Sequence, residues 1–179
     1  MRANIKRWVA EVAQRLELPE PIYEFGSFRV PGQEELANMR PLFPGKEFVG
    51  CDMREGLGVD RIVDLHDLDY RMVPGSVGTV LCLETMEHVR YPHIAMANIF
   101  RVLKEDGVAL ITSTMAQAIH NYPSDYWRYT PEGFKVLLEQ FPSVYVDACG
   151  EQKRPLCVVG VGVKGKEIDL SCLKGALQP

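Results

Sequence analysis

The sequence lacks any apolar run approaching the ~18 residues that a membrane-spanning helix needs. Around Arg2 and Lys6 it also lacks the unbroken apolar stretch and small-residue cleavage site of a signal peptide. Its 179 residues are 46% hydrophobic and 25% charged, as in ordinary globular proteins. We therefore expect one cytoplasmic domain over residues 1–179, with an N-terminal helix within 1–20 and a C-terminal tail at 164–179.

Runs of basic residues are also absent. The chain has 20 Lys and Arg against 24 Asp and Glu, which gives a formal net charge of -4. Proteins that bind nucleic acid without regard to sequence use a cationic face to neutralise phosphates. The charge pattern therefore disfavours nucleic acid as the main partner.

The cysteines form no C-x-x-C pair, and their number, five, is odd. They are widely separated, at Cys51, Cys82, Cys149, Cys157 and Cys172. Three of them fall in apolar, strand-like runs, where a reduced cysteine behaves as a small hydrophobic residue. We expect all five to be buried thiols in a reducing compartment, rather than disulfides or metal ligands.

The remaining pattern alternates strands with helices. Hydrophobic periodicity predicts helices at 3–16, 33–42, 93–103 and 131–141. Short apolar runs predict strands at 22–26, 47–52, 61–65, 77–83, 108–113, 144–149 and 156–163. This alternation indicates an α/β fold with a mostly parallel sheet. The link at 150–155 is too short for a crossover helix, so the last two strands should be antiparallel, and the links at 53–60 and 66–76 should be loops or single turns.

Candidate ligand-binding residues stand at the strand ends, because parallel sheets bind ligands beyond the carboxyl ends of their strands. Asp52 ends the second strand, where a carboxylate can accept hydrogen bonds from ribose hydroxyls. Asp64 ends the third strand, where it could accept from an adenine amino group while Leu65 donates its backbone N–H. Either acid could instead be an ordinary solvated residue at a strand end.

Three segments carry a resemblance to a known family. They are VLCLETMEHV at 80–89, RVLKEDG at 101–107 and DYWRYTPEG at 125–133. The first two resemble the fourth-strand signature and the "RVLKPGG" segment of class I S-adenosylmethionine-dependent methyltransferases, and the third is similar to a segment of a small bacterial subgroup. The resemblance spans about residues 22–141 and implies a Rossmann-like, mostly parallel seven-stranded sheet with an antiparallel C-terminal strand pair and helices on both faces.

The resemblance also implies S-adenosylmethionine as cofactor and assigns its contacts. By matching position these are Glu24, Gly26 and Ser27 for the methionine end, Asp52 and Met53 for the ribose, Asp64 and Leu65 for the adenine, and Leu83 and Glu84 beneath the methionine moiety. The family's E-x-G-x-G-x-G is here EFGSFRV at 24–30, which keeps one glycine of three. Phe28 and Val30 should crowd a tight loop, so we expect the loop to take another path.

Methyl transfer from a sulfonium is an in-line displacement, in which the enzyme mainly aligns the reactants and excludes water. A base is needed only where the acceptor oxygen or nitrogen must lose a proton. His120 follows the fifth strand and is the candidate catalytic base, although a loop histidine can equally cap backbone groups. Asp125, Tyr126 and Arg128 are candidates for shaping the acceptor pocket.

The segment with Glu84, Glu87 and His88 would suit a metal if Glu84 and His88 shared one helical face. The resemblance explains the presence of these residues without a metal, because they belong to the fourth-strand signature of the family, so we expect no metal site. We expect the acceptor to be a small or carrier-borne molecule, whose identity the sequence leaves open, and a second subunit of a homodimer could supply a lid. The alternative is a non-catalytic binding protein that kept this fold, and the missing G-x-G-x-x-G disfavours a nucleotide-binding oxidoreductase.

Overall fold

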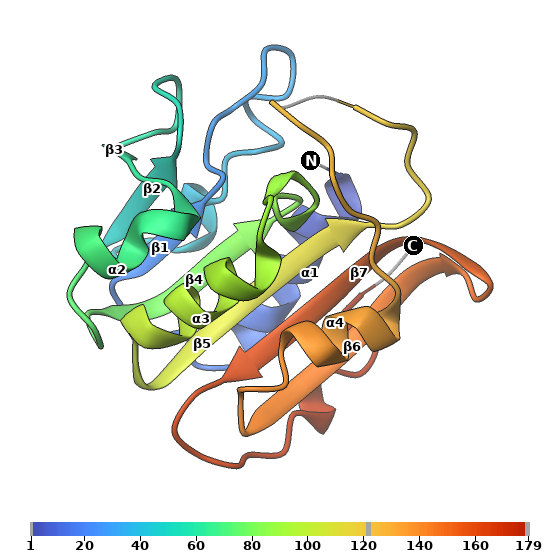
Figure 1. Cartoon of the computed structure of the whole chain (residues 1–179). Helices are drawn as coiled ribbons and strands as arrows, with labels where there is room; N and C mark the ends of the chain where they lie inside the picture. Colours follow the sequence, from blue (N-terminus) through green and yellow to red (C-terminus); the bar gives the residue numbers. More distant parts are fainter. Residues whose placement is uncertain (1, 121–122, 178–179) are drawn as a thin grey trace.

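One mixed sheet organises the chain, which a computed structural model describes at residues 2–120 and 123–177 (Figure 1). The seven strands lie in the order β3-β2-β1-β4-β5-β7-β6. Their bounds are Ile22–Phe25 (β1), Phe48–Asp52 (β2), Arg61–Ile62 (β3), Val77–Leu83 (β4), Leu103–Thr114 (β5), Ser143–Glu151 (β6) and Arg154–Val163 (β7). Strands β1 to β5 pair in parallel, and β7 is antiparallel to both of its neighbours. The predicted seven-stranded sheet and its antiparallel final pair are confirmed.

Helices cover both faces of this sheet, as expected (Figure 1). Helix α1 (Ala3–Arg15) packs on one face, where Trp8 and Val12 meet Leu81 and Leu110. The other face carries α2 (Leu68–Arg71), α3 (Pro92–Val102) and α4 (Pro131–Leu137). Successive strand residues point to opposite faces, so β4, which is covered on both, is buried at every position.

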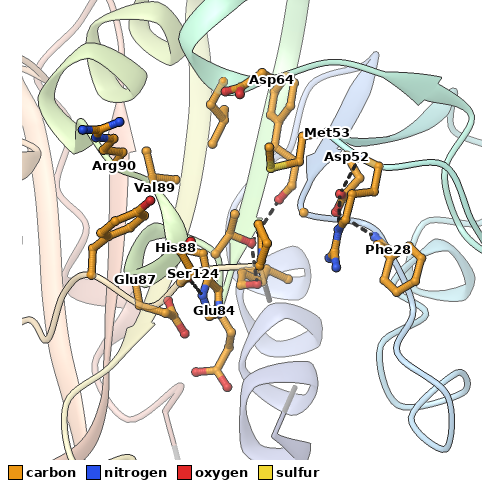
Figure 2. Close-up of a pocket in the computed structure, with 18 of the residues that line it drawn as sticks. Phe28, Asp52, Met53, Asp64, Glu84, Glu87, His88, Val89, Arg90 and Ser124 are labelled. Carbon is orange, nitrogen blue, oxygen red and sulfur yellow. Dashed lines mark hydrogen bonds and ion pairs between the residues drawn. The ribbon is translucent and has the colours of Figure 1, made fainter. Parts of the chain in front are cut away.

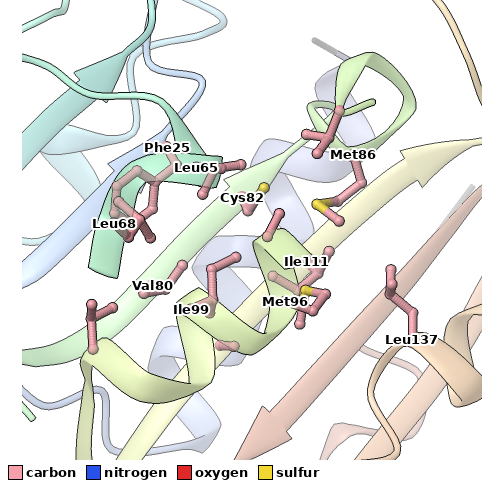
Figure 3. Close-up of a cluster of buried hydrophobic side chains, with 14 of the residues drawn as sticks. Phe25, Leu65, Leu68, Val80, Cys82, Met86, Met96, Ile99, Ile111 and Leu137 are labelled. Atoms are coloured by element: carbon pink, nitrogen blue, oxygen red, sulfur yellow. The ribbon is translucent and has the colours of Figure 1, made fainter. Parts of the chain in front are cut away.

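The core beneath α3 is drawn in Figure 3, where Val80, Cys82 and Ile111 of the sheet lie against Met96 and Ile99 of the helix. All five side chains are at most 1% exposed. This packing fixes α3 behind the carboxyl end of β4, and so fixes the turn that follows β4.

The helix predicted at 33–42 is wrong. This stretch forms turns and a single 3-10 turn at Arg40–Leu42, although one helical bond joins Ala37 to Gln33. Pro41 has no N–H to continue a helix, and only Met39 of the stretch is buried. An isolated helix without a buried face has little to stabilise it.

Other boundaries differ from expectation by a few residues. Strand β3 ends at Ile62, because the Asp64 side chain accepts the N–H of His66 and turns the chain into a 3-10 helix. Helix α4 ends at Leu137 rather than near 141. The links on either side of β3 are a loop and short helices, as predicted for so few residues.

The cysteines are thiols, and four of them are buried. Cys172 is exposed, so its expected burial is wrong. It lies in a 3-10 turn at Ser171–Leu173, where Leu173 is the residue that faces the core. Within residues 2–120 and 123–177, no helix combines the length and apolarity that crossing a membrane requires.

Candidate functional site

A cavity of about 680 Å³ opens at the carboxyl ends of β1, β2 and β4 (Figure 2). The chain leaves β1 for β2 and β3 on one side and returns to β4 on the other, and this switch point is where open α/β sheets bind ligands. The volume lies within the ~300–1,000 Å³ typical of small-molecule pockets. The predicted residues on its wall are Gly26, Asp52, Met53, Asp64, Leu65, Leu83, Glu84, His120 and Tyr126.

The loop after β1 is anchored to β2. The N–H groups of Gly26 and Ser27 both donate to the carbonyl of Cys51, at 2.9 and 3.0 Å. Gly26 has a φ of +85°, and a Cβ there would lie 2.1 Å from the Thr85 hydroxyl oxygen. This position therefore requires glycine on two counts, conformation and space.

Phe28 and Val30, which stand where the family has glycines, both lie on the cavity wall. The Phe28 ring packs on Gly56 and under the Arg54 guanidinium, whose carbon is 4.4 Å from the ring centroid. The loop thus folds over toward residues 54–56 instead of closing tightly on itself.

Asp52 ends β2 with a nearly buried carboxylate (Figure 2). One oxygen accepts the Phe28 N–H at 3.2 Å, and the other accepts the Arg54 N–H at 3.0 Å. A carboxylate offers about four acceptor positions, so these contacts orient the group and leave capacity for ligand hydroxyls.

Asp64 is held in place by His66, which the sequence did not single out. The Asp64 carboxylate accepts from the His66 N–H at 2.9 Å and from its Nδ1 at 2.7 Å. The Nε2 of His66 then accepts the backbone N–H of Tyr91 at 3.2 Å. The short side chain of Asp64 and the following turn thus define one end of the cavity.

Glu84 has a φ of +50°, a sparsely populated backbone region for a residue with a side chain. Its N–H donates to the Thr112 carbonyl at 3.0 Å and lies 2.9 Å from the Thr112 hydroxyl. Burial raises the pKa of its carboxyl, and an ion pair with Arg2 at 2.5 Å opposes that rise. Strained backbone of this kind concentrates at functional sites.

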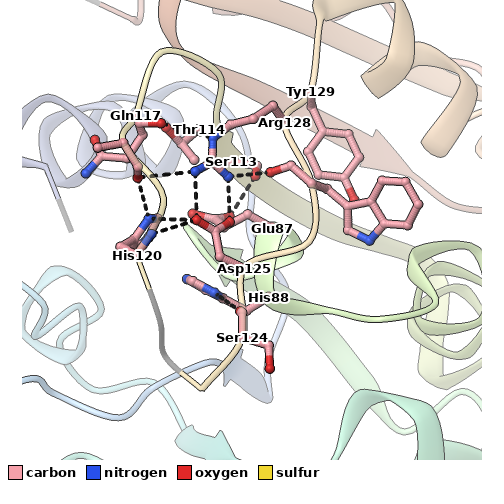
Figure 4. Close-up of polar contacts among 12 residues, drawn as sticks. Glu87, His88, Ser113, Thr114, Gln117, His120, Ser124, Asp125, Arg128 and Tyr129 are labelled. Carbon is pink, nitrogen blue, oxygen red and sulfur yellow. Dashed lines mark hydrogen bonds and ion pairs between the residues drawn. The ribbon is translucent and has the colours of Figure 1, made fainter.

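Residues 114–120 and 123–129, here called the 114–129 loop, cover the adjoining part of the cavity (Figure 4). The N–H groups of Tyr126 and Trp127 donate to the Glu87 carbonyl at 2.8 and 3.2 Å. Asp125 and Arg128 form a two-pronged ion pair at 2.5 and 2.7 Å, which holds the pKa of the Asp125 carboxyl well below its usual range. Neither of these two side chains lies on the cavity wall, whereas that of Tyr126 does.

His120 lies on the wall, next to residues that the sequence did not assign to the site. Its Nδ1 is 3.2 Å from Asp125 Oδ2, and its ring meets that of His88 edge-on at 4.9 Å. Glu87, which is 1% exposed, accepts a 2.6 Å hydrogen bond from the Ser113 hydroxyl. The segment from Glu84 to His88 is not an α-helix, so the helical spacing considered for a metal does not apply.

Two predicted cofactor residues lie off the cavity wall. Glu24 is on β1 and 5% exposed, and burial raises its pKa to about 8 although Arg29, Arg40 and Lys6 oppose that rise. The Ser27 hydroxyl is buried and has no hydrogen-bond partner in the described part of the chain. Its oxygen points toward Gly50 of β2.

Comparison with known proteins gives a family match and a shared fold. Residues 37–111 match the family model described as a methyltransferase domain. A search of curated proteins found no significant match. An S-adenosylmethionine-dependent methyltransferase from Archaeoglobus fulgidus is 14% identical, with 89% of this chain and 93% of that one covered and a TM-score of 0.67.

A second similar structure is the 1,6-didemethyltoxoflavin N1-methyltransferase of Burkholderia thailandensis, which contains 1,6-didemethyltoxoflavin and S-adenosylhomocysteine. It is 16% identical, with 92% of this chain and 79% of that one covered and a TM-score of 0.68. At such identities the likeness is one of fold. Together with the methyltransferase-domain match over residues 37–111, it agrees with the resemblance seen in the sequence: the chain has the fold of class I S-adenosylmethionine-dependent methyltransferases.

Proposed function

We propose that this chain transfers a methyl group from S-adenosylmethionine to an acceptor bound under the 114–129 loop. The observation that carries the proposal is the cavity at the switch point, whose wall holds Gly26, Asp52 and Glu84 together. Bound there, the cofactor supplies a methyl group on a sulfonium, and the protein aligns the acceptor with it and excludes water.

The wall suits the cofactor at three places. Gly26 brings bare backbone to the cavity, where the methionine end would lie. The oriented Asp52 carboxylate, with Met53 beside it, would accept the ribose hydroxyls. Asp64 and Leu65 stand where the adenine would lie. Leu83 and the strained Glu84 would pass beneath the methionine moiety.

Glu24 and Ser27 would act behind this wall, because neither lines the cavity. Their backbone and side chains fix the path of the first loop against β2. Contact with the cofactor through their side chains would require the loop to move.

In this proposal His120 is the base that acts on the methyl acceptor. Its Nδ1 faces the Ala118 carbonyl at 3.1 Å and the Asp125 carboxylate at 3.2 Å, which both only accept. The proton therefore sits on Nδ1, and the lone pair of Nε2 is available to take a proton from an acceptor hydroxyl or amine. Asp125 and Arg128 position this histidine, while Tyr126 contributes a wall of the acceptor space.

A non-catalytic binding protein is the second candidate, favoured by Phe28 and Val30 on the wall where the family has glycines. Calorimetric titration with S-adenosylhomocysteine separates the two. Micromolar binding supports the enzyme, and no heat and no thermal shift at millimolar ligand would reject it.

An Asp52→Ala variant tests the ribose assignment in the same titration. Loss of hydrogen bonds to a charged group should weaken binding about tenfold or more, since each costs ~1.5–3 kcal/mol. Asp69→Ala is the matched control, because Asp69 is exposed on α2 and does not line the cavity. Equal affinities for the Asp52→Ala and Asp69→Ala proteins would remove the assignment.

A further inference from the structure

Three metal-ligand side chains converge on the wall of the cavity, from two separate segments. Glu87 and His88 come from the turn after β4, and His120 comes from the loop after β5 (Figure 4). Each offers one ligand atom, and these atoms all lie within 4.8 Å of one another. Two histidines and one carboxylate are a ligand set suited to first-row divalent cations.

Both histidines are oriented as metal ligands usually are. The Nδ1 of His88 lies 2.5 Å from the Ser124 carbonyl, which can only accept, so this nitrogen carries the proton. His120 Nδ1 is likewise held by the Ala118 carbonyl and the Asp125 carboxylate. Both rings therefore keep an unprotonated Nε2, and an Nδ1–H bound to a carbonyl or carboxylate is the common outer contact of metal-binding histidines.

Two of the three carboxylates around the cluster are paired with arginines. Glu84 pairs with Arg2, and Asp125 pairs with Arg128. Glu87 is 1% exposed, and in the described residues it forms no ion pair; its hydrogen bond comes from the neutral Ser113 hydroxyl. A buried carboxylate without a cation is costly, and a metal ion on the cavity side would supply the missing charge.

We infer that Glu87, His88 and His120 bind a divalent first-row cation such as Mn²⁺ or Zn²⁺. Ligand atoms around a tetrahedral ion with bonds of about 2.1 Å are about 3.4 Å apart, so atoms that lie within 4.8 Å of one another need to approach by at most about 1.4 Å on binding. His120, which stands on a loop, is the ligand able to move. The open coordination positions would face the cavity.

This location gives the cation a role that rests on the proposed function: it would bind the acceptor through oxygen. A bound hydroxyl loses its proton to water more readily, because the cation stabilises the oxyanion. The oxygen then forms a bond to the methyl carbon while the sulfur–carbon bond breaks and its electron pair stays on sulfur. His120 would act through the cation instead of taking the proton itself, which favours hydroxylated acceptors.

The test is calorimetric titration of chelator-treated protein, without a histidine tag and without cofactor, with MnCl₂. We expect about one Mn²⁺ per chain, with affinity at least tenfold weaker for both His120→Gln and Glu87→Gln. His93→Gln is the matched control, because His93 is exposed on α3 and away from the cavity, and its affinity should equal that of the unmodified protein. No Mn²⁺ binding at millimolar concentration, or the same affinity in all four proteins, would overturn the inference.

Glu87 is buried, so its variant could fail to fold, whereas the His120 side chain is partly exposed on a loop and its variant keeps the test decisive. Titration of the unmodified protein with S-adenosylhomocysteine, beside its titration with MnCl₂, distinguishes the two proposals. Cofactor binding without Mn²⁺ binding would remove the cation site alone. Mn²⁺ binding without cofactor binding would leave the site standing and reject the methyltransferase proposal.

Discussion

Glu24 makes the stability of this protein depend on pH. Its carboxyl is 5% exposed in the middle of the sheet, and burial raises its pKa from 4.5 to about 8. Between pH 4.5 and 8, Glu24 is therefore protonated in the folded state and ionised in the unfolded state. Because the folded chain holds more protons in this window, the free energy of unfolding falls as pH rises from 4.5 to 8.

The size of the effect follows from the shift. Each pKa unit corresponds to 1.36 kcal/mol, so the loss approaches about 1.4 kcal/mol per pH unit. From pH 5 to pH 7 the contribution of Glu24 should fall by about 2–3 kcal/mol. A Glu24→Gln variant keeps the shape of the side chain without the ionisation, so this part of the pH dependence should disappear.

The assay is urea unfolding of the unmodified protein and of Glu24→Gln at pH 5, 6, 7 and 8. The free energy of unfolding of the variant minus that of the unmodified protein should rise by about 2–3 kcal/mol from pH 5 to pH 7. Glu139→Gln, at an exposed position after α4, controls for loss of a surface carboxylate. A stability difference between Glu24→Gln and the unmodified protein that does not change with pH would refute the reasoning.

Two other substitutions probe the first loop. Gly26→Ala should lower the free energy of unfolding by more than about 2 kcal/mol, from the ~1–2 kcal/mol of a left-handed residue plus the overlap with Thr85. Urea unfolding of Gly26→Ala with and without Thr85→Ala checks this, and no recovery in the double variant would contradict the overlap. Ser27→Ala should leave the melting temperature unchanged or raise it, because the buried hydroxyl has no partner in the described chain. A weaker affinity for S-adenosylhomocysteine in Ser27→Ala would instead show that this hydroxyl reaches the cofactor.

The fold was predictable where burial and periodicity agree. Strand β4 has the bounds expected from the sequence, because it is buried on both faces, against α3 and against α1, and its side chains are apolar except for that of Thr79. The stretch at 33–42 has apolar residues at helical spacing too, yet only Met39 is buried. Local spacing cannot reveal whether a helix has a surface to pack against, and Pro41 removes a hydrogen bond that such a helix would need.

The strand-end part of the site was predictable for a topological reason. Asp52 ends β2, while Asp64 and Glu84 follow β3 and β4, and parallel neighbours bring their carboxyl ends to one edge. Strand pairing determines which edge of the sheet a residue occupies but not which way its side chain points. Glu24 and Ser27 stand at that edge and still lie off the cavity wall.

The loop part of the site depends on contacts that have no period in the sequence. His120 reaches His88 because the 114–129 loop folds back on the Glu87 carbonyl through two backbone N–H groups. Backbone hydrogen bonds of this kind are open to any residue except proline, so no residue type marks them in advance. Arg2, near the N-terminus, likewise pairs with Glu84, which is 82 residues away in the sequence. Glu87, His88 and His120, which determine whether the site transfers a proton or binds a cation, therefore come together only when the chain folds, and their spacing in the sequence does not predict it.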